Sequence, residues 1–264
     1  MFFNFIVYKF YLNKNKEIIV RDLGKINYQE CFEIQKELQN EIIDIKLSNR
    51  KNKTNLKTPN YLLFVEHNHV YTLGRSGDKN HLLFSEDILN DKDISFHYTN
   101  RGGDITYHGP GQLVVYPILD LENFFTDIHK FLRLMEESVI KSLEQINIAS
   151  SRNTNKTGVW IDVGNNNERK ICAMGVKVSR WVTMHGLALN VTNDLSYFKG
   201  IVPCGLENSK VTSIKNEIGN LIYSFDLKKI LLNNFLKSFS ASSCLLYTSP
   251  SPRDGLLSRM PSSA

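Results

Sequence analysis

The feature that most constrains the fold is a glycine-rich stretch, residues 101–112, which reads RGGDITYHGPGQ and precedes the apolar run LVVYPILDL. Glycine tolerates backbone angles that other residues avoid, and its missing side chain lets the main chain approach a ligand closely. A strand end can place such a loop at the mouth of a pocket. The stretch matches neither GxxxxGK[ST] nor a GxGxxG that opens a helix, so it is not a phosphate loop of these kinds. It predicts either a site shaped by backbone or a tight hairpin.

The composition is that of an ordinary globular protein. The chain has 264 residues, of which 42% are hydrophobic and 22% are charged, enough for one sizeable core. The net charge of +5 is spread along the chain, which disfavours nucleic acid as a partner and would suit an acidic protein. No apolar run approaches the roughly 18 to 20 residues that span a bilayer. The N-terminus lacks the features of a secretory signal, so we expect no membrane association.

The four cysteines form no CxxC pair and no disulfide framework, which predicts a reduced, intracellular protein. Cys31 and Cys172 lie in apolar patterns and are expected in the core. Cys244 lies in the C-terminal tail. Cys204 stands between Pro203 and Gly205, where a tight turn can keep the sulfur near the surface and aim backbone amides at its target. Cys204 is therefore the candidate nucleophile.

A thiol with a pKa of about 8.5 needs a cation nearby to become a thiolate at neutral pH. Such a cation could lower the thiol pKa by about two units, or roughly 2.7 kcal/mol. Sequence spacing alone cannot choose among the candidates Lys170, Lys177, Arg180 and His185.

His67 and His69 have the spacing of a metal-binding pair. No compact third and fourth ligand accompanies them, so we expect no metal site.

Hydrophobic periodicity predicts alternating strands and helices. Helical patterns cover residues 28–47, 82–89 as a short helix and turn with Asp91 and Asp93, 127–147 with Thr126 as N-cap, a turn at 194–198, and 227–239. Loops are expected at residues 48–58 and 67–77. Strand patterns cover residues 17–23, ended by Gly24, and 61–66, 94–99, 112–121, 158–163, 170–179 and 183–191.

Strands and helices alternate irregularly, with hairpins among them. This order predicts an α+β domain built on a mixed β-sheet packed with helices. Pro117 places the strand at 112–121 on an edge of the sheet or at a bulge. We expect one domain over residues 1–240. Residues 241–264 hold seven serines and no lysine, asparagine or isoleucine, which predicts a disordered tail of non-native origin.

Six motifs occur in a fixed order: EHNHVYTLG, RGGDITYHGPGQ, TGVWID, RKICAMG, HGLALNV and IVPCG. Together they resemble the lipoyl(octanoyl) transferase family, which has the biotin and lipoate protein ligase fold. The resemblance covers residues 17–220. Each motif alone is weak, but all six in order are highly specific.

The resemblance implies transfer of an octanoyl group from octanoyl-acyl carrier protein to a lysine of lipoyl domains. The acceptors would be the lipoyl domains of 2-oxoacid dehydrogenase complexes and the glycine cleavage H protein. Enzymes of this family work through a cysteine thioester, aided by a lysine, and need no cofactor. The expected compartment is the cytoplasm, or the mitochondrial matrix if the source is eukaryotic.

Residue by residue, the resemblance implies Cys204 as nucleophile and Lys170 as the catalytic lysine, since Lys177 does not match the motif position. Protonated Lys170 would stabilise the thiolate and, after acylation, could act as base toward the acceptor amine. For His108 a shaping and hydrogen-bonding role is favoured, and the role of general base stays open. The implied acyl-site residues are Arg101, Gly102, Gly103, Asp104, Ile105, Thr106, Tyr107, His108, Ala173, Met174, Gly175, Gly186, Leu187 and Ala188.

Two other classes of function remain open. One is an ATP-using lipoate or biotin ligase on the same fold, which needs no cysteine nucleophile. The other is a non-catalytic protein that binds carrier or lipoyl domains. ATP-independent transfer from an acyl carrier excludes the first, and a covalent adduct excludes the second.

Overall fold

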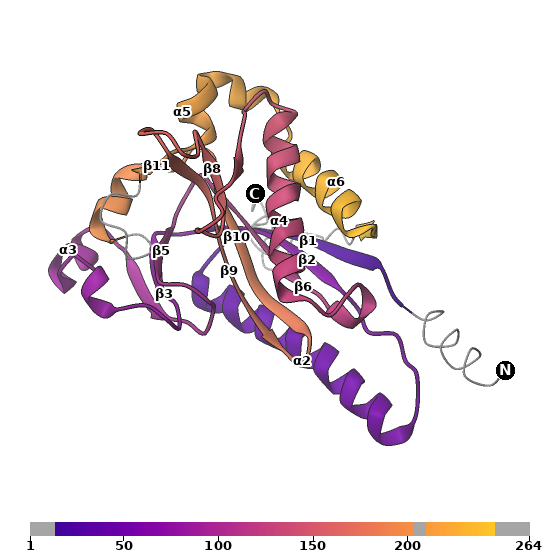
Figure 1. Cartoon of the computed structure of the whole chain (residues 1–264). Coiled ribbons are helices and arrows are strands. Elements are labelled where there is room, and N and C mark those ends of the chain that lie inside the picture. Colours follow the sequence, from indigo (N-terminus) through magenta and orange to yellow (C-terminus); the bar gives the residue numbers. More distant parts are fainter. Residues whose placement is uncertain (1–13, 203–209, 246–264) are drawn as a thin grey trace, which may run out of the picture.

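The computed structural model describes residues 14–202 and 210–245, except for the side chains of residues 223, 224 and 245. It has two β-sheets and several helices (Figure 1). In chain order the elements are β1 (Glu17–Ile26), α2 (Tyr28–Asn52), β2 (Tyr61–His67), β3 (Val70–Leu73), η1 (Lys79–His81), α3 (Glu86–Asp91), β4 (Ser95–Tyr98), β5 (Ile105–His108), β6 (Gln112–Ile118), η2 (Leu121–Asn123), α4 (Ile128–Glu144), β7 (Ser151–Arg152), β8 (Val159–Ile161), β9 (Arg169–Ser179), β10 (Val182–Asn190), η3 (Leu195–Gly200), β11 (Lys210–Val211), α5 (Ile214–Ile218), η5 (Gly219–Ser224), α6 (Leu227–Phe239) and β12 (Ser242–Leu245).

The large sheet has the strand order β12-β1-β2-β6-β10-β9-β8-β7, with β11 paired to β9. It is mixed, because β1 runs parallel to β2 and β12 while β2, β6, β10 and β9 pair in antiparallel fashion. The small sheet has the order β4-β3-β5. The predicted α+β architecture with a mixed sheet is confirmed.

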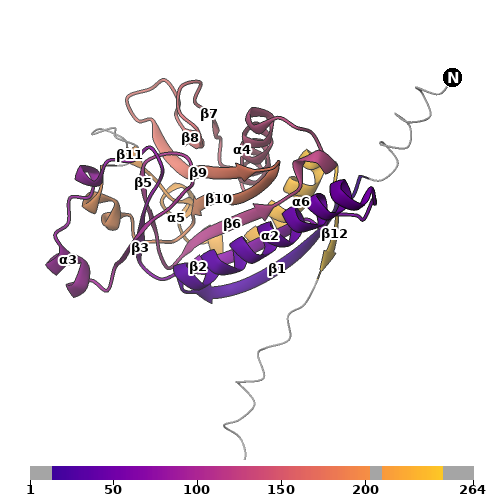
Figure 2. The same ribbon diagram turned by 90° about the horizontal axis from the view of Figure 1, so that it is seen from below.

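Helices cover both faces of the large sheet (Figures 1 and 2). On β2, Leu63 and Val65 pack with α2, whereas Leu62 and Phe64 pack with α4 and α6. This alternation follows from the two-residue period of a strand. Because both faces are buried, β2 is apolar at almost every position. No helix in the described ranges is long and apolar enough to span a membrane.

The strand predicted to end at Gly24 instead continues to Ile26. Gly24 adopts a φ of +60°, and the register with β2 shifts between Asp22 and Lys25. Glycine tolerates this left-handed angle, so the residue marks an irregularity within β1 rather than its end.

Two predicted loops contain regular structure. Helix α2 runs to Asn52, past the expected end at residue 47, because the polar residues after Leu47 continue the helix into solvent. The segment 67–77 contains β3, a fully buried strand of four residues. Four residues are too few to show a period, and two histidines and two glycines around them suggest a loop.

Pro117 was predicted to lie on an edge strand or at a bulge. The edge is wrong, since β6 lies between β2 and β10, and the pairing of β2 with β6 keeps its register through Pro117, with no bulge there. The ladder between β6 and β10 covers only Gln112–Val115 on the β6 side. Beyond it, the Thr183 hydroxyl donates to the Pro117 carbonyl at 2.7 Å and accepts from the Leu119 amide at 2.9 Å. A side chain thus replaces ladder bonds where proline has no N–H.

Two further boundaries differ from the predictions. The N-cap of α4 is Asp127 rather than Thr126, and its carboxylate accepts from the amide of Lys130. Residues 242–245, predicted to be disordered, form β12 beside β1, where Ser243 pairs with Ile18. The prediction is wrong for these four residues because the edge of β1 offers backbone partners. Residues 246–264 lie outside the described part of the chain.

Candidate active site

The glycine-rich loop, residues 101–104, connects β4 to β5 of the small sheet and contacts the large sheet. Arg101 is buried, and its guanidinium donates to the carbonyl of Thr72 in β3 at 2.6 Å and to the Thr72 hydroxyl at 2.9 Å. The Gly102 amide donates to the carbonyl of Val176 in β9 at 2.9 Å. The loop is therefore held to both sheets and lies over β9.

Two glycines outside the loop permit this close approach. A Cβ at Gly74 would lie 2.1 Å from the Gly103 carbonyl oxygen, and a Cβ at Gly175 would lie 2.7 Å from that of Gly102. Both contacts are with backbone, which cannot turn aside as a flexible side chain can. Glycine at these positions therefore lets the loop rest on β3 and β9.

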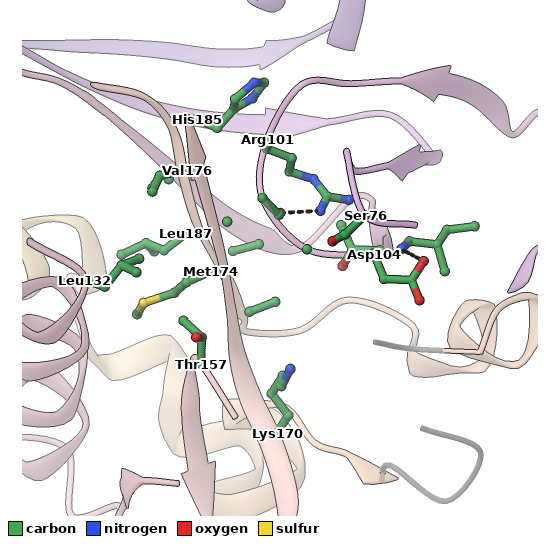
Figure 3. Close-up of a pocket in the computed structure, with 18 of the residues that line it drawn as sticks. Ser76, Arg101, Asp104, Leu132, Thr157, Lys170, Met174, Val176, His185 and Leu187 are labelled. Atoms are coloured by element: carbon green, nitrogen blue, oxygen red, sulfur yellow. Dashed lines mark hydrogen bonds between the residues drawn. The ribbon is translucent and has the colours of Figure 1, made fainter. Parts of the chain in front are cut away.

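The loop borders a cavity of about 900 Å³ (Figure 3). Thirteen of the fourteen predicted acyl-site residues line it, and so does Lys170. They come from the loop, β5, β9 and β10, which the chain folds to one place. The predicted residues that line the cavity are Arg101, Gly102, Gly103, Asp104, Ile105, Thr106, His108, Lys170, Ala173, Met174, Gly175, Gly186, Leu187 and Ala188.

A row of small residues on β9 and β10 leaves space for the cavity. Ala173 pairs with Ala188, and Gly175 pairs with Gly186, across β9 and β10. Because side chains alternate along strands, these residues share one face of the sheet. Met174 and Leu187, also a pair, point to the other side, where Leu132 of α4 lies (Figure 3). Larger residues in the row would fill the space that it leaves.

One predicted acyl-site residue, Tyr107, does not line the cavity. Tyr107 is fully buried between the small sheet and η3, where its ring stacks on Tyr197 and its hydroxyl bonds to Nδ1 of His69 at 2.8 Å. It points away because its neighbours Thr106 and His108 face the cavity. Cys204 lies outside the described residues.

Lys170 lies on β9 with its ammonium nitrogen 4.6 Å from the ring centroid of Trp160. The ammonium of Lys156 lies 5.0 Å from the same ring and forms a 2.9 Å ion pair with Glu168. An aromatic face attracts a cation, so the ring favours positive charge at this end of the cavity. Lys177, the rival candidate, is absent from the lining.

Three histidines lie at or beneath the opposite end of the cavity, and burial keeps them neutral. Burial lowers the pKa of His108 to about 3, of His185 to about 3 and of His67 to about 4. The side chain of Gln112 fixes His108 through a 2.8 Å bond to Nδ1. His108 is thus suited to shaping the cavity, as its sequence context suggested, because its protonated form is disfavoured.

His185 occupies an unusual backbone conformation within β10. Its φ is +63°, and its amide donates to the side chain of the buried Gln35 in α2 at 3.0 Å. Left-handed angles are uncommon for residues other than glycine and occur more often at functional sites. The imidazole lies beside Asn100, whose side-chain oxygen is 2.9 Å from Nε2.

Sequence reasoning missed several lining residues, most of which belong to other elements than the predicted ones. They are Tyr28, Ser76, His81, Tyr116, Ile128, Leu132, Asn155, Lys156, Thr157 and Val176. Only their position in the fold brings them to the cavity. One sequence signal was available, namely the polar loop that precedes TGVWID. In the structure, Glu136 of α4 accepts a hydrogen bond from the Gly158 amide and fixes the end of that loop.

The described cysteines of the core are poor nucleophiles. Cys31 and Cys172 are fully buried, as predicted. Burial raises the pKa of Cys31 to about 12 and that of Cys172 still further, so both remain protonated.

His67 and His69 have different partners. His67 bonds to the Ile26 carbonyl and the Tyr116 hydroxyl, whereas His69 bonds to Tyr107. Within residues 14–202 and 210–245, no group of three His, Cys, Asp or Glu side chains is placed to hold a metal ion.

Gly175→Ala is expected to displace the glycine-rich loop, because the new methyl would lie 2.7 Å from the Gly102 carbonyl oxygen and 3.3 Å from the Arg101 side chain. We expect a loss of about 1–3 kcal/mol in the free energy of unfolding, measured by urea denaturation. Gly102→Ala is the matched control, since its methyl would meet only Val176 at 3.5 Å. Equal stability of the two variants would contradict this packing.

Comparison with known proteins agrees with this geometry. Residues 27–236 match the family described as the lipoyl protein ligase A/B catalytic domain. The octanoyltransferase of Christiangramia forsetii is 54% identical over 86% of this chain and 97% of its own length. That of Flavobacterium johnsoniae is 58% identical over 78% of this chain and 88% of its own length.

Solved structures support the fold. An archaeal bipartite lipoate protein ligase from Thermoplasma acidophilum superposes with a TM-score of 0.61 at 16% identity, over 89% of this chain and 88% of its own. Lipoate-protein ligase A bound with ATP gives a TM-score of 0.60 at 15% identity, over 89% and 90% of the two chains. The chain therefore belongs to the family of the lipoyl protein ligase A/B catalytic domain and, within it, to the octanoyltransferases.

Proposed function

We propose that the protein transfers an octanoyl group from octanoyl-acyl carrier protein to a lysine of a lipoyl domain, through a thioester on Cys204. One observation supports this most directly. The cavity gathers Lys170 and the predicted acyl-site segments, which are far apart in sequence, around one space. The described chain reaches Val202, two residues before Cys204, where the Val202 amide donates to the carbonyl of the cavity-lining His81 at 2.8 Å.

In the first step, the Cys204 thiolate attacks the thioester carbonyl of the octanoyl carrier. The Lys170 ammonium stabilises the thiolate, and backbone amides of the glycine-rich loop or of the segment around Cys204 stabilise the oxyanion. The C–S bond to the carrier breaks, and the carrier thiol leaves. An octanoyl-Cys204 intermediate remains.

The octanoyl chain would lie along the row of Ala173, Gly175, Gly186 and Ala188. Burial of about seven methylene and methyl groups at about 0.8 kcal/mol each contributes roughly 5 to 6 kcal/mol, sufficient to discriminate chain lengths. A large side chain in that row would shorten the chain that fits.

In the second step, the amine of the acceptor lysine attacks the thioester, and Cys204 leaves as a thiolate. In this proposal Lys170, whose negative partner is removed by acylation, accepts the proton of the acceptor amine and, as an ammonium, receives the thiolate again.

The test is to incubate the protein with octanoyl-carrier protein in the absence of ATP and to weigh the intact protein. We expect an octanoyl adduct, which disappears on addition of a lipoyl domain as the domain gains the octanoyl group. A requirement for ATP would indicate a ligase instead. Binding of both proteins with neither adduct nor transfer would indicate a non-catalytic binder.

The acceptors would be lipoyl domains of 2-oxoacid dehydrogenase complexes and the glycine cleavage H protein. The relatives cited above are bacterial, which favours the cytoplasm as the compartment. A lipoyl domain whose acceptor lysine is replaced by arginine should gain no octanoyl group in the same assay.

A further inference from the structure

The cavity ends at a cluster of polar rings on the side of β6. Tyr116 lines the cavity from β6, and the His67 ring lies 5.9 Å from the rings of both Tyr116 and His108. The registers of β6 with β10 and of β10 with β9 put Tyr116 near the level of Gly175, two strands across the sheet. Gly175 is five residues beyond Lys170 on β9, so this cluster, the inner end of the cavity, is about 16 Å from the Lys170 backbone along the strands and about 10 Å across them.

The bonds of Gln112 determine which nitrogen of His108 carries the proton. The side-chain nitrogen of Gln112 donates to the Tyr107 carbonyl at 3.2 Å and to Oδ1 of Asn190 at 2.9 Å. Asn190 is fixed in turn, since its own nitrogen donates to the Thr212 carbonyl at 2.9 Å. The oxygen of Gln112 therefore faces His108, and because an amide oxygen only accepts, Nδ1 of His108 donates the 2.8 Å bond. Burial lowers the pKa of His108 to about 3, so the ring is neutral and Nε2 has a lone pair but no proton.

The hydroxyl of Tyr116 is oriented by His67. A carbonyl only accepts, so Nδ1 of His67 donates to the Ile26 carbonyl at 3.0 Å. Burial lowers the pKa of His67 to about 4, so the ring is neutral and its Nε2 accepts from the Tyr116 hydroxyl at 2.9 Å. Because this bond uses the only hydroxyl proton of Tyr116, the Tyr116 oxygen can form further hydrogen bonds only as an acceptor.

The inner end of the cavity thus has two acceptors and needs a donor. His108 and Tyr116 both line the cavity and are only 7% and 3% exposed. Within residues 14–202 and 210–245, no group donates to Nε2 of His108 or to the Tyr116 oxygen. A buried acceptor that stays unpaired is destabilising, and a methyl group cannot pair with it. A carboxylate cannot pair with it either, because it only accepts. The ligand group that matches this end of the cavity is a hydroxyl or another neutral donor.

We propose that Nε2 of His108, together with the Tyr116 oxygen, forms a hydrogen-bond acceptor site that selects the far end of the acyl chain. The site favours a chain with a terminal hydroxyl group over an equally long chain that ends in a methyl group. The hydroxyl donates a hydrogen bond to Nε2, whereas a methyl-ended chain that reaches the site leaves the acceptors unpaired, which limits the length of unsubstituted chains. This inference rests on the proposed function for the identity of the ligand as an acyl chain, and it makes His108 a specificity-determining residue.

The test compares 8-hydroxyoctanoate with nonanoate, two ligands of equal length in which a hydroxyl replaces a methyl group. Their dissociation constants are measured by calorimetry on wild type and His108→Leu, and the value for nonanoate is divided by that for 8-hydroxyoctanoate. We expect this ratio to fall by about tenfold or more in His108→Leu, the effect of one buried hydrogen bond. The loss of water from the ligand hydroxyl is common to both proteins and cancels in the comparison.

His97→Leu is the matched control for His108→Leu. The His97 ring lies 5.2 Å from the Tyr28 ring and that of His108 lies 6.3 Å from it, but His97 is not among the described residues that line the cavity. The ratio should therefore keep its wild-type value in His97→Leu. Circular dichroism shows whether each variant is folded.

Tyr116→Phe tests the same site if His108→Leu does not fold, because it removes one hydroxyl and keeps the size of the side chain. The ratio should fall by about threefold or more, since one acceptor is lost while His108 remains. Tyr61→Phe is the control for this variant and should keep the wild-type ratio. The Tyr61 hydroxyl bonds to Glu41 of α2, and Tyr61 is not among the described lining residues.

Rates of adduct formation with 8-hydroxyoctanoyl-carrier and nonanoyl-carrier protein separate this inference from the proposed function. If no adduct forms but the calorimetric ratio falls as expected, the proposed function fails and the acceptor site stands. If adducts form but the ratio is the same in wild type, His108→Leu and Tyr116→Phe, the acceptor site is overturned and the proposed function stands. An equal fall in a control variant would also overturn the site, as would the failure of wild type to bind either ligand.

Discussion

Cys204→Ser is expected to abolish the octanoyl adduct formed with octanoyl-carrier protein, whereas Cys172→Ser keeps it. A serine hydroxyl is far less acidic than a thiol, so the cation that produces a thiolate cannot produce an alkoxide at neutral pH. Cys172 is fully buried, and burial raises its pKa so that it cannot replace Cys204. The measurement is intact mass after incubation, with peptide mapping to locate the acyl group.

Two controls make this prediction specific. Cys31→Ser removes the other buried thiol and should leave the adduct unchanged. Cys244 is exposed on β12 and could be acylated without catalysis, so Cys244→Ser should remove only a slow background that hydroxylamine also removes. A rapid adduct that persists on Cys204→Ser would exclude Cys204 as the nucleophile and, with it, the proposed mechanism.

The sequence predicted well those elements whose pattern is long enough to show a period. Helix α6 matches its predicted range, and β9 and β10 differ from theirs by one residue at each end or less. Prediction from the sequence failed where contacts between distant segments decide the local structure. Pro117 suggested an edge or a bulge, whereas it lies inside the sheet, where the Thr183 hydroxyl donates to its carbonyl. The four residues of β3 are strand because the small sheet surrounds them.

The site shows the same division. The ordered motifs predicted the cavity-lining residues of the glycine-rich loop, β9 and β10, because within each motif these residues are contiguous along the chain. Tyr107 was included with its motif although strand alternation turns it away from the cavity. His81 was not predicted, because the fold brings it to the cavity beside Asp104, 23 residues later, and no local pattern reveals this contact.

Lys170→Ala is expected to slow adduct formation at pH 7 by roughly 25-fold. A cation that lowers a thiol pKa from about 8.5 by about two units raises the thiolate fraction at pH 7 from about 3% to about 75%. Removal of the cation reverses this gain. At pH 9 the Cys204 thiol would be mostly ionised in both wild type and Lys170→Ala, so the difference in rate between them should shrink to less than about twofold. The measurement is the rate of octanoyl adduct formation at the two pH values.

Further lysine variants identify which positive charge stabilises the Cys204 thiolate. Lys177→Ala should form the adduct at nearly the wild-type rate, because Lys177 does not line the cavity. Lys170→Arg should retain a large part of the rate, since a guanidinium keeps the positive charge and also packs against an aromatic ring such as Trp160. Lys156→Ala tests the second ammonium on that ring and should cost less than Lys170→Ala, because Glu168 already balances its charge. Equal losses for Lys170→Ala and Lys177→Ala, or a loss that persists at pH 9, would show that Lys170 does not act by stabilising the thiolate.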